Sequence, residues 1–245
     1  MQLIKPLYRE NYAGEEVITQ LVYQGGTRVP TIEHMPNQII NLQISNQALI
    51  IGNGTTRLDF DLGLLKNHRA GLMGSRRLQS YGCNAVYRDV ETDFLVATGE
   101  EIVSEIANSD YCKDHIVYAS SESIVQYPQK FYLIPQDPHW NSGSIATYLA
   151  CFDGHTKVFL LGFDGNDMTK GHYNVYANTP GYYTSDSNIP EDFWSQSMVQ
   201  VFQAYPNVDF VRVGPTRGYR MPEAWRYQPN LRGIDFRDFV IEADF

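Results

Sequence analysis

The sequence predicts a three-layer α/β sandwich with a mostly parallel sheet. From Ala48 onward, short apolar runs alternate with longer amphipathic stretches, and strands that alternate with helices pair in parallel through crossover connections. The apolar runs are nearly continuous, as in parallel strands that are covered on both faces. A chain of 245 residues, of which 43% are hydrophobic, is long enough to bury such a core.

The short apolar runs are the expected strands of this sheet. In chain order they are Ala48–Ile51, Leu78–Val86, Asp93–Thr98, His115–Ser120, Phe131–Pro135, Lys157–Asp164 and Val208–Val213. The last segment of the chain, Phe236–Phe245, alternates apolar and charged residues, which is typical of a half-buried strand.

Helical periodicity occurs between these runs. Ile145, Leu149 and Phe152 fall on one stripe of the middle stretch, and Pro190 suits the first position of the last one. The predicted helices are Gly99–Asn108, Ser142–His155 and Pro190–Tyr205.

Turn-forming residues divide the chain into three parts. The stretch Gly25–Pro36 is rich in turn formers, so we expect residues 1–46 to form an N-terminal appendage. Residues 47–213 form the predicted α/β domain, with a lid-like loop at 164–190. Residues 214–245 are predicted to be a C-terminal appendage that packs on the same domain.

The charge and the cysteine content indicate which kinds of partner and which cellular compartment the protein is suited to. The net charge of −9 and the pI near 5.1 disfavour nucleic acid as the main partner and favour small ligands or proteins. The three cysteines, Cys83, Cys112 and Cys151, are widely spaced and follow no metal-ligand pattern. We expect them to be reduced, buried thiols of a cytosolic protein.

The lengths of the apolar runs also indicate where in the cell the protein is located. None of them approaches the ~18 to 20 apolar residues of a membrane span, and the N-terminal stretch has no apolar core of signal-peptide length. We therefore expect a cytoplasmic protein without a membrane span.

The stretch "QALIIGNGTTRLDFD", residues 47–61, places a glycine turn directly after a strand. The turn runs through Gly52, Asn53 and Gly54, and Thr55 and Thr56 follow. Glycines permit close approach, and backbone N–H groups at such a turn bind phosphate. The motif lacks the third glycine of the dinucleotide fingerprint and the lysine of a P-loop, so an ordinary tight turn is the alternative.

Small or polar residues also end the other predicted strands. Asn84 follows the second strand, Thr98 ends the third, Ser142 and Gly143 open a helix, and Asp164 ends "LLGFD". Ligands of parallel sheets bind beyond the carboxyl ends of the strands, so these residues are expected to meet. Each has a structural alternative: Ser142 as a helix cap, Asp164 as a turn cap, and Asn84 in a left-handed conformation.

The order "IIGNGTT", "GCNAVYRD", "DFLVA" and "SGSIATYLACFDGHTKVFLLGFD" resembles one group of enzymes. This group unites the bacterial sialyltransferases that use CMP-sialic acid with the MptE-like 6-hydroxymethylpterin diphosphokinases, and it includes small proteins of marine bacteria and their phages. The resemblance covers Ala48–Asp164 well and Pro190–Val213 loosely. It implies that residues 47–213 form a Rossmann-like nucleotide-binding domain.

The resemblance also implies roles for individual residues. Thr98 stands where the sialyltransferases carry asparagine and the MptE-like enzymes aspartate, so neither a ribose contact nor a Mg²⁺ ligand transfers to it. Gly165 and Asn166 replace an aromatic pair of the sialyltransferases, which argues against sialyl transfer. Asp164 matches the aspartate of a G-x-D turn. The positions expected at the nucleotide are Gly52, Asn53, Gly54, Thr55, Thr56, Asn84, Thr98, Ser142 and Gly143.

The connection 164–190 is polar, rich in tyrosine, and longer than the usual ~4 to 6 residues, which is typical of a lid or a substrate-binding insertion. His172 is the histidine nearest to the expected site, and its near-neutral pKa suits a general base. The alternative for His172 is a surface histidine without a catalytic role.

Asp164 is the second candidate catalytic residue, and Asp164 with Asp167 could share Mg²⁺. The tyrosines that could stack on a base, sugar or pterin ring are Tyr173, Tyr176, Tyr182 and Tyr183.

Arginines gather in two places. Guanidinium groups suit phosphate and carboxylate contacts; the alternatives are pairing with the many carboxylates of the chain, or a subunit interface in a homo-oligomer. These arginines are Arg76, Arg77, Arg212, Arg217, Arg220, Arg226, Arg232 and Arg237.

Three functions follow from these observations. The first is a nucleotide-dependent transferase that moves a sugar from a nucleotide-sugar to a small-molecule or glycan acceptor. The second is Mg²⁺-dependent pyrophosphoryl transfer to a pterin-like alcohol, which releases AMP. The third is a non-catalytic nucleotide-binding or assembly protein. Motifs of serine hydrolases and zinc enzymes are absent from the sequence, and no cofactor is required under the first function.

Overall fold

The computed structural model describes residues 4–9, 12–22, 26–39, 45–66, 78–164, 174–182, 191–215 and 221–245. Its main feature is an eight-stranded sheet of order β10-β9-β8-β3-β4-β5-β6-β7. All neighbouring strands in this sheet are parallel, which confirms the predicted Rossmann-like α/β class. The strands are β3 (Gln47–Ile51), β4 (Gln79–Cys83), β5 (Phe94–Val96), β6 (Ile116–Ala119), β7 (Tyr132–Leu133), β8 (Lys157–Leu161), β9 (Asp209–Val213) and β10 (Leu231–Ile234).

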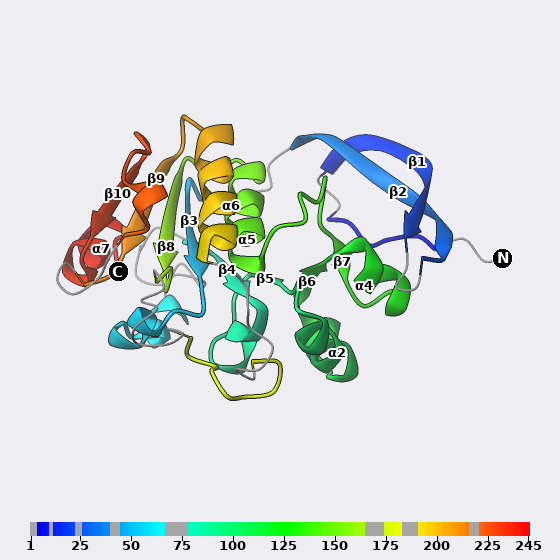
Figure 1. The fold of residues 1–245 in the computed structure, drawn as a ribbon, viewed down its shortest axis with the longest axis horizontal. Helices are drawn as coiled ribbons and strands as arrows, with labels where there is room; N and C mark the ends of the chain where they lie inside the picture. Colours follow the sequence, from blue (N-terminus) through cyan, green and yellow to red (C-terminus); the bar gives the residue numbers. More distant parts are fainter. Residues whose placement is uncertain are drawn as a thin grey trace.

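Helices cover this sheet. In Figure 1, α5 and α6 lie side by side in front of it, and α5 packs against β3, β4 and β5. The carboxamide of Asn141 accepts a hydrogen bond from the backbone N–H of Ser144 at 3.1 Å and so caps α5; the predicted cap, Ser142, is the first helical residue instead. The helices are α2 (Glu100–Asn108), α3 (Tyr111–Asp114), α4 (Ser121–Gln126), α5 (Ser142–Phe152), α6 (Glu191–Ala204) and α7 (Phe236–Glu242).

The order of the strands reverses at one place. The chain adds β4, β5, β6 and β7 successively on one side of β3, and α5 then returns it to β8 on the other side. The crevice at such a reversal, beyond the carboxyl ends of the strands, is where open α/β sheets bind ligands. In Figure 1 the arrows of β3 and β8 end at the lower edge of the sheet, where segment 174–182 also lies.

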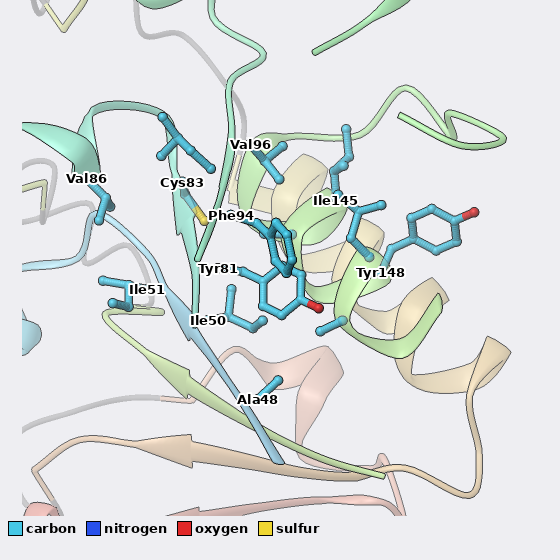
Figure 2. Close-up of a cluster of buried hydrophobic side chains, with 14 of the residues drawn as sticks. Ala48, Ile50, Ile51, Tyr81, Cys83, Val86, Phe94, Val96, Ile145 and Tyr148 are labelled. Atoms are coloured by element: carbon cyan, nitrogen blue, oxygen red, sulfur yellow. The ribbon is translucent and has the colours of Figure 1, made fainter. Parts of the chain in front are cut away.

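The core fills the space between the sheet and α5. Ile50, Tyr81 and Phe94 point toward this helix, where Ile145 lies close to them, while the Tyr148 ring points away from them (Figure 2). Tyr81 and Phe94 contact each other with ring centroids 5.0 Å apart. Burial of such continuous apolar strands is the main favourable term in folding, and it holds the carboxyl edge in a rigid frame.

Strand β4 is shorter than predicted. It ends at Cys83 because Asn84 adopts a left-handed conformation, with φ of 48°, and a 3₁₀ helix follows over Asn84–Arg88. Asparagine tolerates this region better than most residues. The backbone therefore turns sharply at the sheet edge and places the half-buried Asn84 side chain there.

The prediction of a strand at Phe236–Phe245 was wrong. Residues Phe236–Glu242 form helix α7, which Asp235 caps by accepting a hydrogen bond from the N–H of Asp238 at 2.9 Å. Phe239 is fully buried and its ring contacts Phe159 of β8. The cap and this aromatic contact favour a helix, although the segment alternates apolar and charged residues.

Strands β1 (Tyr12–Val22) and β2 (Arg28–Ile39) form a separate two-stranded antiparallel sheet. The N-terminal segment that precedes them bridges to the main sheet, because the carbonyl of Leu7 accepts a hydrogen bond from the N–H of Leu133 at 3.0 Å. Further along this segment, Arg9 pairs with the buried Asp153 at 2.6 Å.

All three cysteines are free; Cys83 and Cys151 are buried and Cys112 is half-buried. Within the described ranges, no helix combines the length and apolar character needed to cross a membrane.

Candidate functional site at the carboxyl edge of the sheet

The glycine turn packs backbone against backbone on the end of β8. Gly52 N–H donates to the carbonyl of Leu161 at 2.8 Å, and Gly54 N–H donates to the carbonyl of Gly162 at 2.9 Å. A Cβ on Gly54 would lie 2.4 Å from the carboxyl carbon of Asp164. The glycines are therefore required for this contact. The expectation that their N–H groups point outward to a phosphate is not met, because β8 and its extension use them.

Asp164 fastens the same turn. Its carboxylate accepts hydrogen bonds from the backbone N–H of Thr56, at 2.9 Å, and from the Thr56 hydroxyl. Both side chains are buried. In this arrangement Asp164 supports the 3₁₀ helix Thr55–Asp59 that follows the turn, and its carboxylate is occupied by that contact.

Asn53, between the two glycines, is the residue of the turn that faces the segment 174–182. Its backbone carbonyl accepts from the N–H of Val175 at 2.8 Å, and its Nδ2 donates to the hydroxyl oxygen of Tyr182 at 2.8 Å. The Oδ1 atom is buried and has no hydrogen-bond partner among the described residues. Asn53 thus places one donor and one unused acceptor at the sheet edge.

Asn84 approaches the same point from β4. Its Oδ1 accepts a hydrogen bond from the backbone N–H of Thr98 at 2.9 Å, which orients the side chain and joins the ends of β4 and β5. Burial raises the pKa of the Tyr182 hydroxyl, and hydrogen bonds from the Ala85 backbone and from the Asn53 and Asn84 side chains act in the opposite direction. The Tyr182 hydroxyl therefore lies between the ends of β3 and β4, and the Asn53 side chain donates to it.

Tyr176 is held in place by an ion pair between the buried Arg57 and the exposed Asp89. The Nη2 of Arg57 lies 2.6 Å from Asp89 and donates to the Tyr176 hydroxyl at 2.6 Å, and that hydroxyl donates to Asp89 at 2.6 Å. Burial is the main cause that raises the pKa of Tyr176, followed by its hydrogen bond to Asp89. The Arg57 side chain is 1% exposed, whereas the Asp89 side chain is 42% exposed, so the contact is buried on the arginine side only.

A second arginine holds the middle of the segment. Arg88 donates to the Thr179 hydroxyl and to the Pro180 carbonyl, each at 3.0 Å. The same guanidinium pairs with Glu105 of α2, and this hydrogen bond is the main cause that lowers the pKa of Glu105.

Sequence analysis missed Arg57, Arg88 and Asp89. A signal was present, since Arg57 and Arg88 both lie in the short helical turns that follow predicted strand ends.

The start of α5 reaches the turn through Phe163. A Cβ on Gly143 would lie 3.3 Å from the Phe163 ring, and a Cβ on Gly52 would also lie 3.3 Å from it. Ser142 is buried at the first position of the helix. From β9, the buried Arg212 donates its Nε to the Phe163 carbonyl at 3.2 Å.

The structure thus brings most of the predicted site residues to one edge. Asp164 contacts Gly54 and Thr56 of the turn that also contains Gly52 and Asn53. Asn84, Thr98, Ser142 and Gly143 lie at the same edge in the ways described above. Thr55 is half-buried and close only in sequence. No group of three or more His, Cys, Asp or Glu residues that could hold a metal ion occurs among the described residues. The predicted residues that lie outside the described ranges are Asp167, His172, Tyr173, Tyr183, Arg76, Arg77, Arg217 and Arg220.

Solved structures with a similar fold are bacterial sialyltransferases. The sialyltransferase Cst-I of Campylobacter jejuni, a monofunctional α-2,3-sialyltransferase, is 14% identical to this chain, with a TM-score of 0.43 over 73% of this chain and 79% of that one. CstII of the same organism, in complex with CMP-3FNeuAc, is 10% identical with a TM-score of 0.43 over 68% and 79%. A CST-II variant in complex with CMP is 12% identical with a TM-score of 0.43 over 68% and 81%.

All three of these structures are of sialyltransferases, and two of them hold CMP or CMP-3FNeuAc. No protein-family model and no curated protein sequence matches the chain.

Proposed function

We propose that the carboxyl edge of β3, β4 and β8 binds the nucleotide of a nucleotide-sugar and that the chain transfers the sugar to an acceptor hydroxyl. The observation that carries the proposal is the side-chain donor of Asn53, which reaches the Tyr182 hydroxyl at 2.8 Å at the sheet edge, beside the place where the strand order reverses. Such a donor suits the phosphate of a nucleotide, whose charged oxygens form stronger hydrogen bonds than neutral ones.

Each part of the site has a role in this proposal. Asn53 and Asn84 hold the phosphate, and the free Oδ1 of Asn53 accepts a hydrogen bond from a ribose hydroxyl or a base amine. Asp164 acts through Thr56 by keeping the glycine turn in place. Ser142 and Gly143 present the N-terminus of an eleven-residue helix, which favours negative charge.

The transfer breaks the bond between the anomeric carbon and the phosphate oxygen, which leaves with the electron pair. The acceptor oxygen bonds to the anomeric carbon, and its proton passes to a base, for which His172 is our candidate. N–H donors directed at the leaving phosphate stabilise the negative charge that develops there. This step needs no other co-reactant.

Binding is tested first, by thermal shift with CMP, UDP, GDP, ADP and ATP, each with and without Mg²⁺. A ligand at one hundred times its Kd adds about 2.7 kcal/mol to stability, which for a chain of this length raises Tm by roughly 5 to 10 °C. Asn53→Ala and Asn84→Gly should abolish the shift, and glycine keeps the left-handed backbone of residue 84. The matched control is Asn108→Ala, because Asn108 is exposed in α2.

Turnover is tested second, by the release of free nucleotide from CMP-, UDP- and GDP-sugars, with His172→Asn against His115→Asn as the control. Release of CMP, UDP or GDP supports the proposal, and AMP formed from ATP would replace it with pyrophosphoryl transfer. Binding without release would identify a non-catalytic nucleotide-binding protein. Equal shifts in wild type, Asn53→Ala and Asn84→Gly would place the nucleotide elsewhere.

A further inference from the structure

The hydroxyl of Tyr182 occupies the point at the sheet edge toward which Asn53 directs its side-chain donor. Asn53 Nδ2 donates to it at 2.8 Å, and the Ala85 backbone and the Asn84 side chain lie near enough to lower the pKa of the hydroxyl. A neutral phenol oxygen accepts hydrogen bonds less strongly than a charged oxygen does, and a phosphate oxygen carries negative charge. The Asn53 donor is therefore better matched to an anion than to the tyrosine that holds it.

The tyrosine also leaves Asn53 incompletely satisfied. With Tyr182 in place, the Oδ1 atom of Asn53 is buried and lacks a partner among the described residues. A buried acceptor without a hydrogen bond loses its interaction with water and gains nothing in return. Displacement of Tyr182 would expose this oxygen to water or to a hydroxyl group of a ligand.

The rest of segment 174–182 is fastened without Tyr182. Arg57 and Asp89 hold Tyr176, and Arg88 holds Thr179 and Pro180. The Tyr182 backbone is joined to the same turn, since the Asn178 N–H donates to the Tyr182 carbonyl at 3.0 Å and the Tyr182 N–H donates to the Thr179 carbonyl at 2.9 Å, but these bonds do not involve the Tyr182 side chain. Gly181, with φ of +80°, directly precedes Tyr182. Glycine at this position permits a change of backbone direction that other residues resist. The Tyr182 side chain can therefore leave the Asn53 donor while the segment stays docked through residues 176–180.

We propose that Tyr182 is an internal competitor of the ligand: its hydroxyl holds the side-chain donor of Asn53 until a phosphate displaces it. The inference rests on the proposed function in that a nucleotide is the expected phosphate carrier. It predicts that removal of one oxygen atom, in Tyr182→Phe, strengthens phosphate binding. A tyrosine that contacts the bound phosphate would have the opposite effect.

The test is isothermal titration of wild type, Tyr182→Phe and Tyr227→Phe with inorganic phosphate and with the five nucleotides. Tyr227 is 79% exposed, so its variant controls for the loss of a phenol oxygen. We expect Tyr182→Phe to lower the Kd of phosphate and of the preferred nucleotide about fivefold or more, because competition is removed, and Tyr227→Phe to leave both Kd values unchanged. An unchanged or higher Kd in Tyr182→Phe overturns the inference.

The two proposals fail in different ways. If phosphate binds more tightly to Tyr182→Phe but no nucleotide binds to either protein, the inference stands and the proposed function falls. If nucleotides bind equally well to both, the function stands and the inference falls. Absence of all binding, to phosphate and nucleotides alike, overturns both.

Hydrogen exchange of the wild type gives a second readout that does not depend on the variant. The Tyr182 N–H donates to the Thr179 carbonyl at 2.9 Å. Saturating phosphate or nucleotide should speed exchange at Tyr182 and leave Val175, which donates to Asn53, unchanged. Slower exchange at Tyr182 would mean that the segment closes over the ligand, which contradicts displacement.

Discussion

The carboxylate of Asp164 holds Thr56 by two hydrogen bonds, one from the backbone N–H at 2.9 Å and one from the hydroxyl, across 108 residues of chain. This contact joins the residues after β8 to those after β3 at the place where the strand order reverses. Together with the hydrogen bonds from Gly52 and Gly54 to the end of β8, this contact keeps Asn53, which lies between the two glycines, at the edge of the sheet. Stability of the turn and competence of the site are therefore coupled.

Asp164→Asn should weaken both. An amide accepts fewer and weaker hydrogen bonds than a carboxylate, so we expect the free energy of unfolding to fall by roughly 1 to 3 kcal/mol and nucleotide affinity to fall with it. Urea unfolding measures the first and titration the second. Asp61→Asn is the control, because Asp61 is exposed and accepts a single hydrogen bond from Gly63 N–H. Equal losses in both variants would contradict the coupling.

Gly54→Ala should disrupt the contact between the turn and β8. The new methyl group would lie 2.4 Å from the Asp164 carboxyl and 2.5 Å from the Gly162 carbonyl, so overpacking should cost roughly 1 to 3 kcal/mol. Gly99→Ala is the matched control at the end of β5, where the nearest atom is 3.8 Å away, and its effect should stay within ~0.5 kcal/mol. Thermal unfolding of both variants decides the point, and a tolerated Gly54→Ala would show that the turn can move.

Arg57→Met should release Tyr176 and leave Asp89 without its partner. Because the Asp89 carboxylate is 42% exposed, water can solvate it after the loss of Arg57, and the expected cost is that of the lost hydrogen bonds to charged groups, roughly 1 to 3 kcal/mol. Arg237→Met, at an exposed position of α7, should change little. Chemical unfolding compares the two, and hydrogen exchange should show loss of protection at residues 174–180 only in Arg57→Met. Retained protection there would mean that Arg88 suffices to hold the segment.

His155 should make the fold sensitive to acid. Burial lowers the pKa of this histidine to about 4, from 6.5 for an exposed one. Between these two pH values His155 is protonated in the unfolded chain and neutral in the folded chain. Its contribution to the free energy of unfolding is therefore fully present above pH 6.5 and is lost as the pH falls toward 4. The loss attributable to His155 is on the order of 3 kcal/mol.

Urea unfolding at several pH values measures this effect. His155→Gln should flatten the dependence between pH 6.5 and 4, whereas His115→Gln should not. Carboxylates titrate in the same range in all three proteins, so the difference between the curves is the quantity of interest. Parallel curves for wild type and His155→Gln would assign the acid sensitivity to those carboxylates.

The sequence predicted the main elements because their signals are local. The apolar run at Ala48–Ile51 and the helical stripe of Ile145 and Leu149 need no knowledge of distant residues. The segment Phe236–Glu242 shows where such signals fail, because its alternation suggests a strand, while the Asp235 cap and the burial of Phe239 favour a helix.

The candidate site was predicted in part for the same reason. Asn53, Asn84 and Asp164 were found because each follows a strand, and parallel strands end at the same edge of the sheet. Arg57 and Arg88 were missed, since an arginine near a strand end has many alternative roles and only its partners reveal which one it has.

By itself, the sequence determined the α/β class, the succession of strands and helices, and the set of small and polar residues that end the strands. Only the tertiary structure decided what these residues contact. The N–H groups of the glycine turn donate to carbonyls at the end of β8, Thr56 donates to the Asp164 carboxylate, and Asn53 donates to the Tyr182 hydroxyl. The physical reason is that these contacts join segments separated by as many as 129 residues. Which polar groups meet at such distances depends on the packing of the whole core, and no local pattern encodes it.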